Sequence, residues 1–345
     1  MKIIRHSLRF VVAGTIAALS SYALHAQPRQ AYVLAKTIML GSPDRWDYAV
    51  ADPAASRVYV AHGDRVTVID AKTGAVLGQV EGMPGGTHGI GVSAATGQGF
   101  TDDGEKGEAV AFDLKSLKVT RRIPAAADAD GIAADPLTGR IFVVEGDPGT
   151  ITVIDPKTNR VVATIKAGEK MEYLAADRRG HVYVAGEGNS DVLKIDARTA
   201  TIVSRWPAPR CDKPHGMALD EARNRLFMSC VNEKLVVVDA GSGKVVATLP
   251  IGKGSDAVAF DPVRRRVFSS DGRDGKVTVY QQKTSDSYEA LASIPTVVSA
   301  RNMTVDTHSG RVFVVGADTE PNATPGGRPK IKAGTVRVMI FDPVS

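Results

Sequence analysis

Seven polar residues, spaced 41 to 45 positions apart, carry the side chains of this chain that point most clearly to chemistry. They are carboxylates, imidazoles and one guanidinium: Asp47, His88, Asp130, Glu172, His215, Asp256 and Arg301. Imidazole and carboxylate groups together suit zinc, copper, nickel or manganese. Carboxylates gathered in one place also attract a basic ligand or an arginine, because their mutual repulsion raises the pKa of some of them. Either chemistry requires elements that bring the seven side chains together.

Each of these residues begins a repeated unit of about forty residues. A short apolar run is followed by an Asp turn, an Arg with a Val-Tyr-Val-like strand, an alternating strand ending in Asp, and a last β-branched strand. The residues after Asp256 align in this way with those after Asp130. Repeats of this period with four strands each are typical of a β-propeller. The sequence therefore predicts an all-β fold, a seven-bladed β-propeller of four-stranded antiparallel blades.

The third unit shows the strand pattern most clearly, and the two ends of the chain complement each other. The strands expected in that unit are Gly131–Ala134, Arg140–Glu145, Thr150–Asp155 and Arg160–Lys166. The last unit stops at Pro343 after its third strand, whereas Tyr32–Leu40, ahead of the first unit, is similar to the fourth strands. We expect this N-terminal segment to complete the last blade and close the ring, which removes an exposed edge.

The predicted fold gathers the unit-start residues at the mouth of a central channel. The chain enters each blade beside the channel from one common face, and second strands return to that face. Trp46 flanks the first unit start and adds an aromatic group. The predicted ligand-binding funnel consists of Asp47, His88, Asp130, Glu172, His215, Asp256, Arg301, His62, Glu145, Asp271 and Trp46.

Two interpretations of this funnel stay open. One is a divalent metal ion with His88, His215, Asp130 and Glu172 as ligands, which requires a narrow channel because the two histidines are three blades apart. The other is a solvated polar funnel in which Arg301 pairs with carboxylates. The short-range ligand pairs typical of zinc sites do not occur in the sequence. The cofactor is therefore undefined, with a divalent metal ion as the candidate.

The most repeated residues fit the scaffold instead. Aspartates end the innermost and the third strands, immediately before tight turns, as Asp135 and Asp155 illustrate. Asp in such turns accepts hydrogen bonds from the backbone two residues further on. Turn chemistry alone explains these two columns of acids.

The chain has two cysteines, Cys211 and Cys230, both placed by the repeat at the fifth blade. In an exported chain two thiols favour a disulfide, which would hold the loop that carries His215. The alternative is a pair of soft metal ligands beside His215.

The N-terminus has the features of a secretory signal peptide. Lys2, Arg5 and Arg9 surround an apolar stretch, and small residues allow cleavage after Ala23 or Ala26. The apolar stretch is too short to span a membrane. We therefore expect a signal peptide over residues 1–26, one propeller domain over 27–345, and export to a bacterial periplasm. Removal of the signal peptide takes away three basic residues and leaves 40 basic and 38 acidic residues. This small positive excess is weak evidence for binding to nucleic acid.

The repeat resembles that of the YncE-like family of exported bacterial YVTN-repeat β-propellers. The resemblance covers essentially all of the mature chain, with signature strands at Val58–Ala61, Val182–Ala185 and Val312–Val315 and a companion strand at Val66–Asp70. Unit two departs from it, with Gly99-Phe-Thr-Asp in place of the signature strand. The resemblance implies the fold, export, and surfaces for binding and interaction, without a defined reaction.

Three functions follow as hypotheses. The first is a non-catalytic, monomeric binding protein that recognises a small molecule, a peptide or a protein partner at the funnel. The second is a metal-dependent hydrolase of the lactonase type, in which the His and carboxylate ring activates water. The third, which we expect least, is single-stranded nucleic-acid binding by aromatic residues and the insertion Asp318–Ala333, with Arg328, Lys330 and Lys332.

Overall fold

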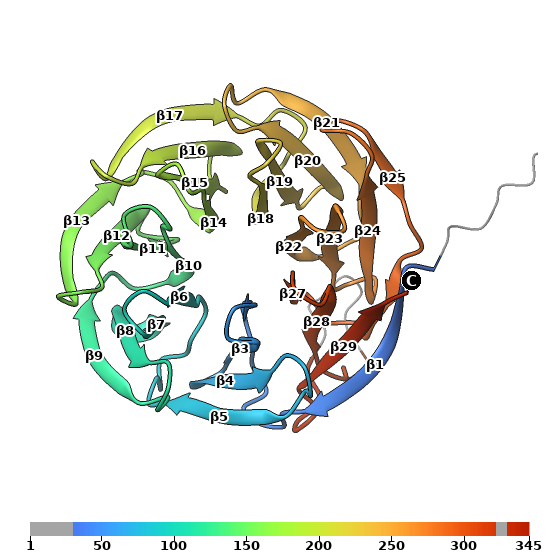
Figure 1. The fold of residues 1–345 in the computed structure, drawn as a ribbon, viewed down its shortest axis with the longest axis horizontal. Coiled ribbons are helices and arrows are strands. Elements are labelled where there is room, and N and C mark those ends of the chain that lie inside the picture. Colours follow the sequence, from blue (N-terminus) through green and yellow to red (C-terminus); the bar gives the residue numbers. More distant parts are fainter. Residues whose placement is uncertain (1–29, 322–329, 345) are drawn as a thin grey trace, which may run out of the picture.

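The computed structural model describes residues 30–321 and 330–344 of the chain. The chain forms a ring of seven antiparallel sheets around a central channel (Figure 1). The predicted signal peptide and its cleavage site lie outside the described residues. The seven-bladed propeller is confirmed.

Each blade runs outward from the channel, with its first strand innermost. Blades 1 to 3 are β2 (Ala49–Asp52), β3 (Arg57–His62), β4 (Arg65–Asp70) and β5 (Val76–Glu81); β6 (Gly91–Ser93), β7 (Gln98–Asp103), β8 (Glu108–Asp113) and β9 (Val119–Pro124); and β10 (Ala129–Ala134), β11 (Ile141–Glu145), β12 (Thr150–Asp155) and β13 (Arg160–Lys166). Blades 4 and 5 are β14 (Met171–Ala176), β15 (His181–Gly186), β16 (Asp191–Asp196) and β17 (Thr201–Pro207); and β18 (Pro214–Asp220), β19 (Arg225–Cys230), β20 (Lys234–Asp239) and β21 (Val245–Pro250).

Blades 6 and 7 depart from this plan at their outer edges. They are β22 (Ser255–Asp261), β23 (Arg266–Asp271), β24 (Lys276–Gln282), β25 (Tyr288–Ala290) and β26 (Ile294–Pro295); and β27 (Asn302–Asp306), β28 (Arg311–Gly316), β29 (Arg337–Pro343) and β1 (Tyr32–Met39). In blade 6 two short segments, β25 and β26, share the place of one outer strand on β24. The one helix of the described residues is the short 3-10 helix η1 (Gly104–Lys106), and none of them forms a helix that could cross a membrane.

The N-terminal segment closes the ring as predicted. Strand β1 pairs antiparallel with β29 from Tyr32 opposite Pro343 to Met39 opposite Arg337. The first and last parts of the described chain thus share one sheet, which leaves the last blade complete.

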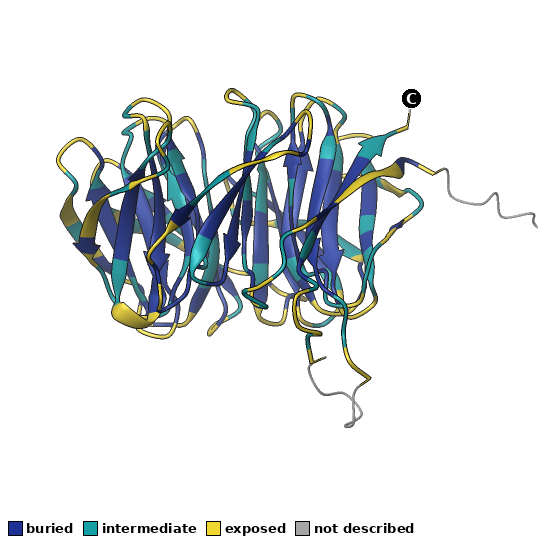
Figure 2. Ribbon diagram, turned by 90° about the horizontal axis from the view of Figure 1, so that it is seen from below, coloured by how far each residue is buried: buried dark blue, intermediate teal, exposed yellow. Residues whose placement is uncertain are grey.

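Apolar side chains of neighbouring blades pack against one another between the sheets. Second strands such as β11 are buried along their whole length, whereas outer strands such as β17 alternate between exposed and half-buried residues (Figure 2). The turn aspartates accept the predicted hydrogen bonds: Asp70 Oδ1, for example, accepts from the amides of Lys72 and Thr73 at 3.0 and 2.7 Å. These acids stabilise turns.

Candidate functional site

All seven unit-start residues line one cavity of about 460 Å³ at the mouth of the channel. Four more side chains complete its lining: Arg45, Tyr48, Asp128 and Lys170. Five carboxylates therefore face this central cavity, together with three permanently charged cations and two imidazoles.

Bulges in the inner strands place several of these side chains. In blades 3 to 6 the pairing of the first strand with the second slips by one residue at the unit start, for example between Ala129 and Ile132. The extra residue lies at Asp130, Glu172, His215 or Asp256 or at the residue beside it. A bulge turns a side chain out of the regular alternation of a strand, and bulges are common beside functional sites.

Glycines that follow the unit-start residues let neighbouring blades approach closely. A Cβ atom at Gly89 would stand 2.1 Å from the carbonyl oxygen of Asp130, and one at Gly216 would stand 2.5 Å from that of Asp256. No heavy side-chain atom fits at these distances, so glycine is required here for steric reasons. The inner strands can therefore converge, which narrows the cavity.

His88 is held by two groups that the sequence analysis did not identify. Its Nδ1 lies 2.7 Å from Oδ2 of the buried Asp102, whose Oδ1 accepts from the His88 amide at 2.8 Å. Arg45 donates to Nε2 at 2.8 Å. Burial disfavours the charged ring, but the hydrogen bond and charge of Asp102 outweigh it and raise the pKa of His88 to about 9. The Arg45 hydrogen bond can therefore form only above this pKa, when the ring is neutral, because a protonated Nε2 has no free lone pair.

Arg301 lies between two carboxylates of the ring. Its guanidinium is 3.7 Å from Asp47 and 3.5 Å from Asp256, and the Asn302 amide is 3.4 and 3.3 Å from the same two groups. Burial works to raise the pKa of Asp256, but the hydrogen bond with His215 and the charge of Arg301 outweigh it and lower the pKa. This side of the cavity therefore contains paired charges.

Two of the cavity carboxylates, Asp130 and Asp47, have raised pKa values. Burial and the charges of Asp47 and Asp128 raise the pKa of Asp130 to about 8. Burial also raises the pKa of Asp47, against the opposing charge of Arg301. Carboxyl groups in this state are held away from water without enough positive charge nearby.

Glu172 and His215 approach each other and a third residue, Glu187. One donor atom from each of the three lies within 4.8 Å of the others. Burial, the charge of Asp130 and the adjacent Glu187 raise the pKa of Glu172 well above its ordinary value. The predicted metal ligands are thus divided: His88 and Asp130 lie outside this group, and Glu187 belongs to it.

Four predicted funnel residues do not line the central cavity, and three of them line neither that cavity nor the one beside it. His62, Glu145 and Asp271 end second strands and are fully buried. They hold loops in place: His62 Nε2 lies 2.9 Å from the Pro43 carbonyl, and Asp271 accepts from the Gly252 amide at 2.9 Å. Glu145 accepts from Thr150 Oγ1 at 2.8 Å. The prediction failed because these residues are one strand removed from the channel and lie under the loops between blades.

Trp46 lines a second cavity of about 650 Å³, here called the outer cavity. This cavity shares Arg45, His215, Asp256 and Arg301 with the central one. The indole of Trp46 is 5% exposed, and its N–H makes no hydrogen bond to the described residues. Ile331, from the described part of the Asp318–Ala333 insertion, also lines the outer cavity.

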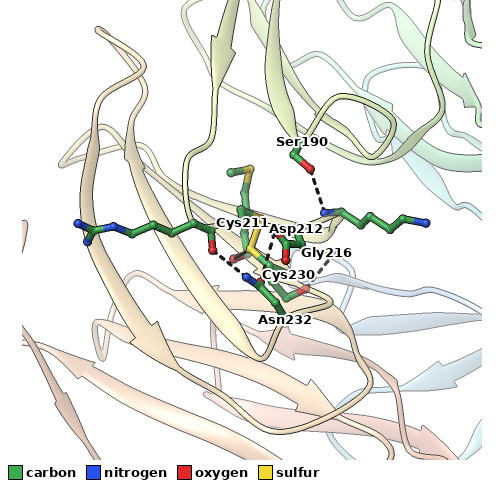
Figure 3. The surroundings of a disulfide bond; sticks show 10 residues. Ser190, Cys211, Asp212, Gly216, Cys230 and Asn232 are labelled. Atoms are coloured by element: carbon green, nitrogen blue, oxygen red, sulfur yellow. Dashed lines mark hydrogen bonds between the residues drawn. A yellow bond between two sulfur atoms is a disulfide. The ribbon is translucent and has the colours of Figure 1, made fainter.

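Cys211 and Cys230 form the predicted disulfide, with Cα atoms 5.2 Å apart (Figure 3). The bond fastens the loop before β18 to the end of β19, and the amide of Lys213 in this loop donates to Ser190 Oγ at 3.1 Å. Both sulfur atoms are therefore unavailable as metal ligands, which excludes the alternative interpretation of the two cysteines.

A usable signal existed for one missed residue. Asp102 is the next-to-last residue of its second strand, where the other blades have Ala, Val or Ser. A charge in this small or apolar column marks a buried partner, and Asp102 is that partner of His88. Glu187 follows directly after β15, where the repeat gave no reason to single it out.

Comparisons with solved structures agree with the architecture. Kuenenia stuttgartiensis hydrazine synthase superposes with a TM-score of 0.69 at 14% identity, over 88% of this chain and 96% of that one. A structure of U3-55K superposes with a TM-score of 0.76 at 13% identity, over 92% of this chain and 100% of that one. The WD40 repeats of RRP9 superpose with a TM-score of 0.76 at 14% identity, over 91% of this chain and 99% of that one. At such identities the likeness concerns the fold alone. Comparison with curated proteins gives no match.

A family profile supplies the relationship in sequence. The PQQ_2 profile, described as outer membrane protein assembly factor BamB, matches residues 62–324, which is most of the chain. The finer resemblance to YncE-like proteins stays a prediction. The chain belongs to the BamB family of β-propeller proteins.

Proposed function

We propose that the protein is an exported, non-catalytic binding protein that takes up a positively charged ligand in the central cavity. The ligand is a small molecule, or a basic side chain of a peptide or protein partner. One observation carries the proposal: five carboxylates face the cavity, against three permanent cations, Arg45, Lys170 and Arg301, and a fourth when His88 is protonated.

The charge balance favours a cation over other ligands. Converging carboxylates must take up protons or bind positive charge, and the pKa of about 8 at Asp130 shows how strongly this position resists ionisation. A cationic ligand would allow Asp130 and Asp47 to ionise and would gain their attraction at short range. The outer cavity, which shares four residues with the central one, offers room for the remainder of a larger ligand.

The fold and the disulfide support the setting of this function. Propellers commonly mediate binding to partners, and the family is named after an outer membrane assembly factor. A disulfide suits an oxidising compartment outside the cytoplasm. These features support the periplasm as the location.

A thermal-shift panel tests the proposal. Arginine amide and lysine amide serve as cationic probes, with acetate and glutamate as anionic ones. At ten times its dissociation constant a bound probe stabilises by about 1.4 kcal/mol, which raises Tm by about 2 °C or more. The cationic probes are expected to do so, and the anionic probes are not.

A pair of matched variants shows where the probe binds. Asp47→Asn with Asp130→Asn removes two cavity carboxylates, whereas Asp155→Asn with Asp196→Asn removes two turn aspartates. The shift should disappear in the first variant and persist in the second. Stabilisation by anionic probes, or an equal cationic shift in both variants, would contradict the proposal.

A further inference from the structure

We infer that Glu172, Glu187 and His215 form a site for a divalent transition-metal ion such as zinc or manganese at one side of the central cavity. The inference rests on the proposed function and deepens it, because it names a metal ion as a cation that the cavity receives.

The three residues come from adjacent blades and meet at one point. Glu172 lies on β14, Glu187 follows β15, and His215 lies on β18. One donor atom from each lies within 4.8 Å of the other two, so a single ion between them can contact all three after small side-chain movements. One imidazole with two carboxylates is a donor set that zinc and manganese accept, with positions left for water.

Glu187 is the most deeply buried of the three residues, and its ion pair with Lys170 satisfies it only in part. Only 8% of this residue is exposed, and its Oε2 atom makes no hydrogen bond to the described residues. The ammonium group of Lys170 offsets part of the cost of burying this oxygen, and a metal ion bound directly to it would offset more. Oε2 belongs to the carboxylate that lies beside Glu172 and His215.

His215 is oriented as metal-bound histidines are. Its Nδ1 lies 3.4 Å from Asp256 Oδ1, so Asp256 can accept the Nδ1 proton and hold the ring. This arrangement leaves Nε2 as the ligand atom. A carboxylate behind a histidine fixes its tautomer and ring orientation in many metal sites.

Two lysines pair with the carboxylates of the site in the absence of metal. Lys170 Nζ lies 3.3 Å from Glu187 Oε2 and 3.9 Å from Glu172 Oε1, and Lys213 Nζ lies 3.5 Å from Glu187 Oε1. Their side chains are 43% and 63% exposed, so both ammonium groups can withdraw into solvent when an ion arrives. The lysines therefore compete with the metal, and removing one should strengthen metal binding.

The test is calorimetric titration of untagged, metal-free mature protein with Zn²⁺, with Ca²⁺ as a control ion that prefers an all-oxygen site. One Zn²⁺ per chain is expected, with Ca²⁺ binding much more weakly. Glu187→Gln and His215→Ala should each weaken Zn²⁺ binding at least tenfold, and Lys170→Gln should strengthen it. Asp155→Asn, which alters a turn aspartate outside the cavity, should leave one Zn²⁺ bound with unchanged affinity.

The outcomes separate this inference from the proposed function. Circular dichroism and thermal unfolding establish that each variant is folded, and the isosteric Glu187→Gln decides the question if His215→Ala does not fold. Absence of stoichiometric Zn²⁺ binding, or equal binding in the wild type and Glu187→Gln, would overturn the metal site. If Zn²⁺ fails but arginine amide still stabilises the protein through Asp47 and Asp130, the proposed function stands without it.

Discussion

Tyr48 of blade 1 and Tyr173 of blade 4 meet across the central channel, with ring centroids 4.5 Å apart. Each residue directly follows a cavity carboxylate, Asp47 or Glu172. Burial raises the pKa of Tyr173 to about 12, and burial with the charges of nearby carboxylates raises that of Tyr48 well above its ordinary value. Both phenols therefore stay neutral, and their contact closes the channel at this point. A ligand would enter and leave the cavity by the funnel face.

Removing one of these rings should loosen the centre of the propeller. Tyr173→Ala deletes a partly buried aromatic ring and is expected to lower the free energy of unfolding by about 3 kcal/mol. Tyr173→Phe keeps the ring contact and should cost about 1 kcal/mol or less. Urea unfolding of the two variants measures the difference; equal losses would show that the ring contact contributes nothing.

The close approach of blades 5 and 6 depends on Gly216. A Cβ atom there would stand 2.5 Å from the Asp256 carbonyl oxygen and 2.6 Å from the Val258 amide nitrogen, so the inner strands must separate. Gly216→Ala should cost about 2 kcal/mol or more, as overpacking does. Gly241→Ala is the matched control, because its Cβ would meet only side-chain ends at 3.0 Å or more. Thermal unfolding compares the two, and similar Tm values would refute the steric argument.

Asp102 and Arg45 should move the pKa of His88 in opposite directions. Asp102→Asn leaves burial, which disfavours the charged ring, opposed only by the charges of Asp47 and Asp130, so the pKa should fall from its wild-type value. Arg45→Ala removes a neighbouring cation, so the pKa should rise above the wild-type value of about 9. NMR titration of the ring protons measures both shifts. Unchanged values in both variants would contradict this description of the pair.

The raised pKa of Asp130 predicts a stability that depends on pH. Below about pH 4 the carboxyl is protonated in both the folded and the unfolded state, and no penalty arises. As the pH rises toward 8, the unfolded state ionises first, and stability is lost. Asp130→Asn removes this loss and should stabilise the protein by about 1–3 kcal/mol at pH 8 and little at pH 4. Denaturant unfolding at both pH values measures the difference, and a gain that is equal at both would disprove the assignment.

The period of the repeat was sufficient to predict the ring, its closure by Tyr32–Leu40 and the convergence of Asp130 with its counterparts. These predictions succeeded because a regular repeat in a closed ring fixes the position of the first residue of each blade. The prediction failed for His62 and Asp271. The direction of a strand indicates at which face of the propeller a residue lies, but it does not indicate how far the side chain is from the channel. The bulges, and the approach of Glu187 to His215, depend on packing between blades. The sequence of a single repeat unit does not reveal this packing.

The central claim, that the cavity carboxylates bind a cationic ligand, is tested most directly by calorimetric titration with arginine amide. One site is expected in the wild type and in the Asp155→Asn, Asp196→Asn variant, with affinity at least tenfold weaker in the Asp47→Asn, Asp130→Asn variant. The same affinity in all three proteins would contradict this claim.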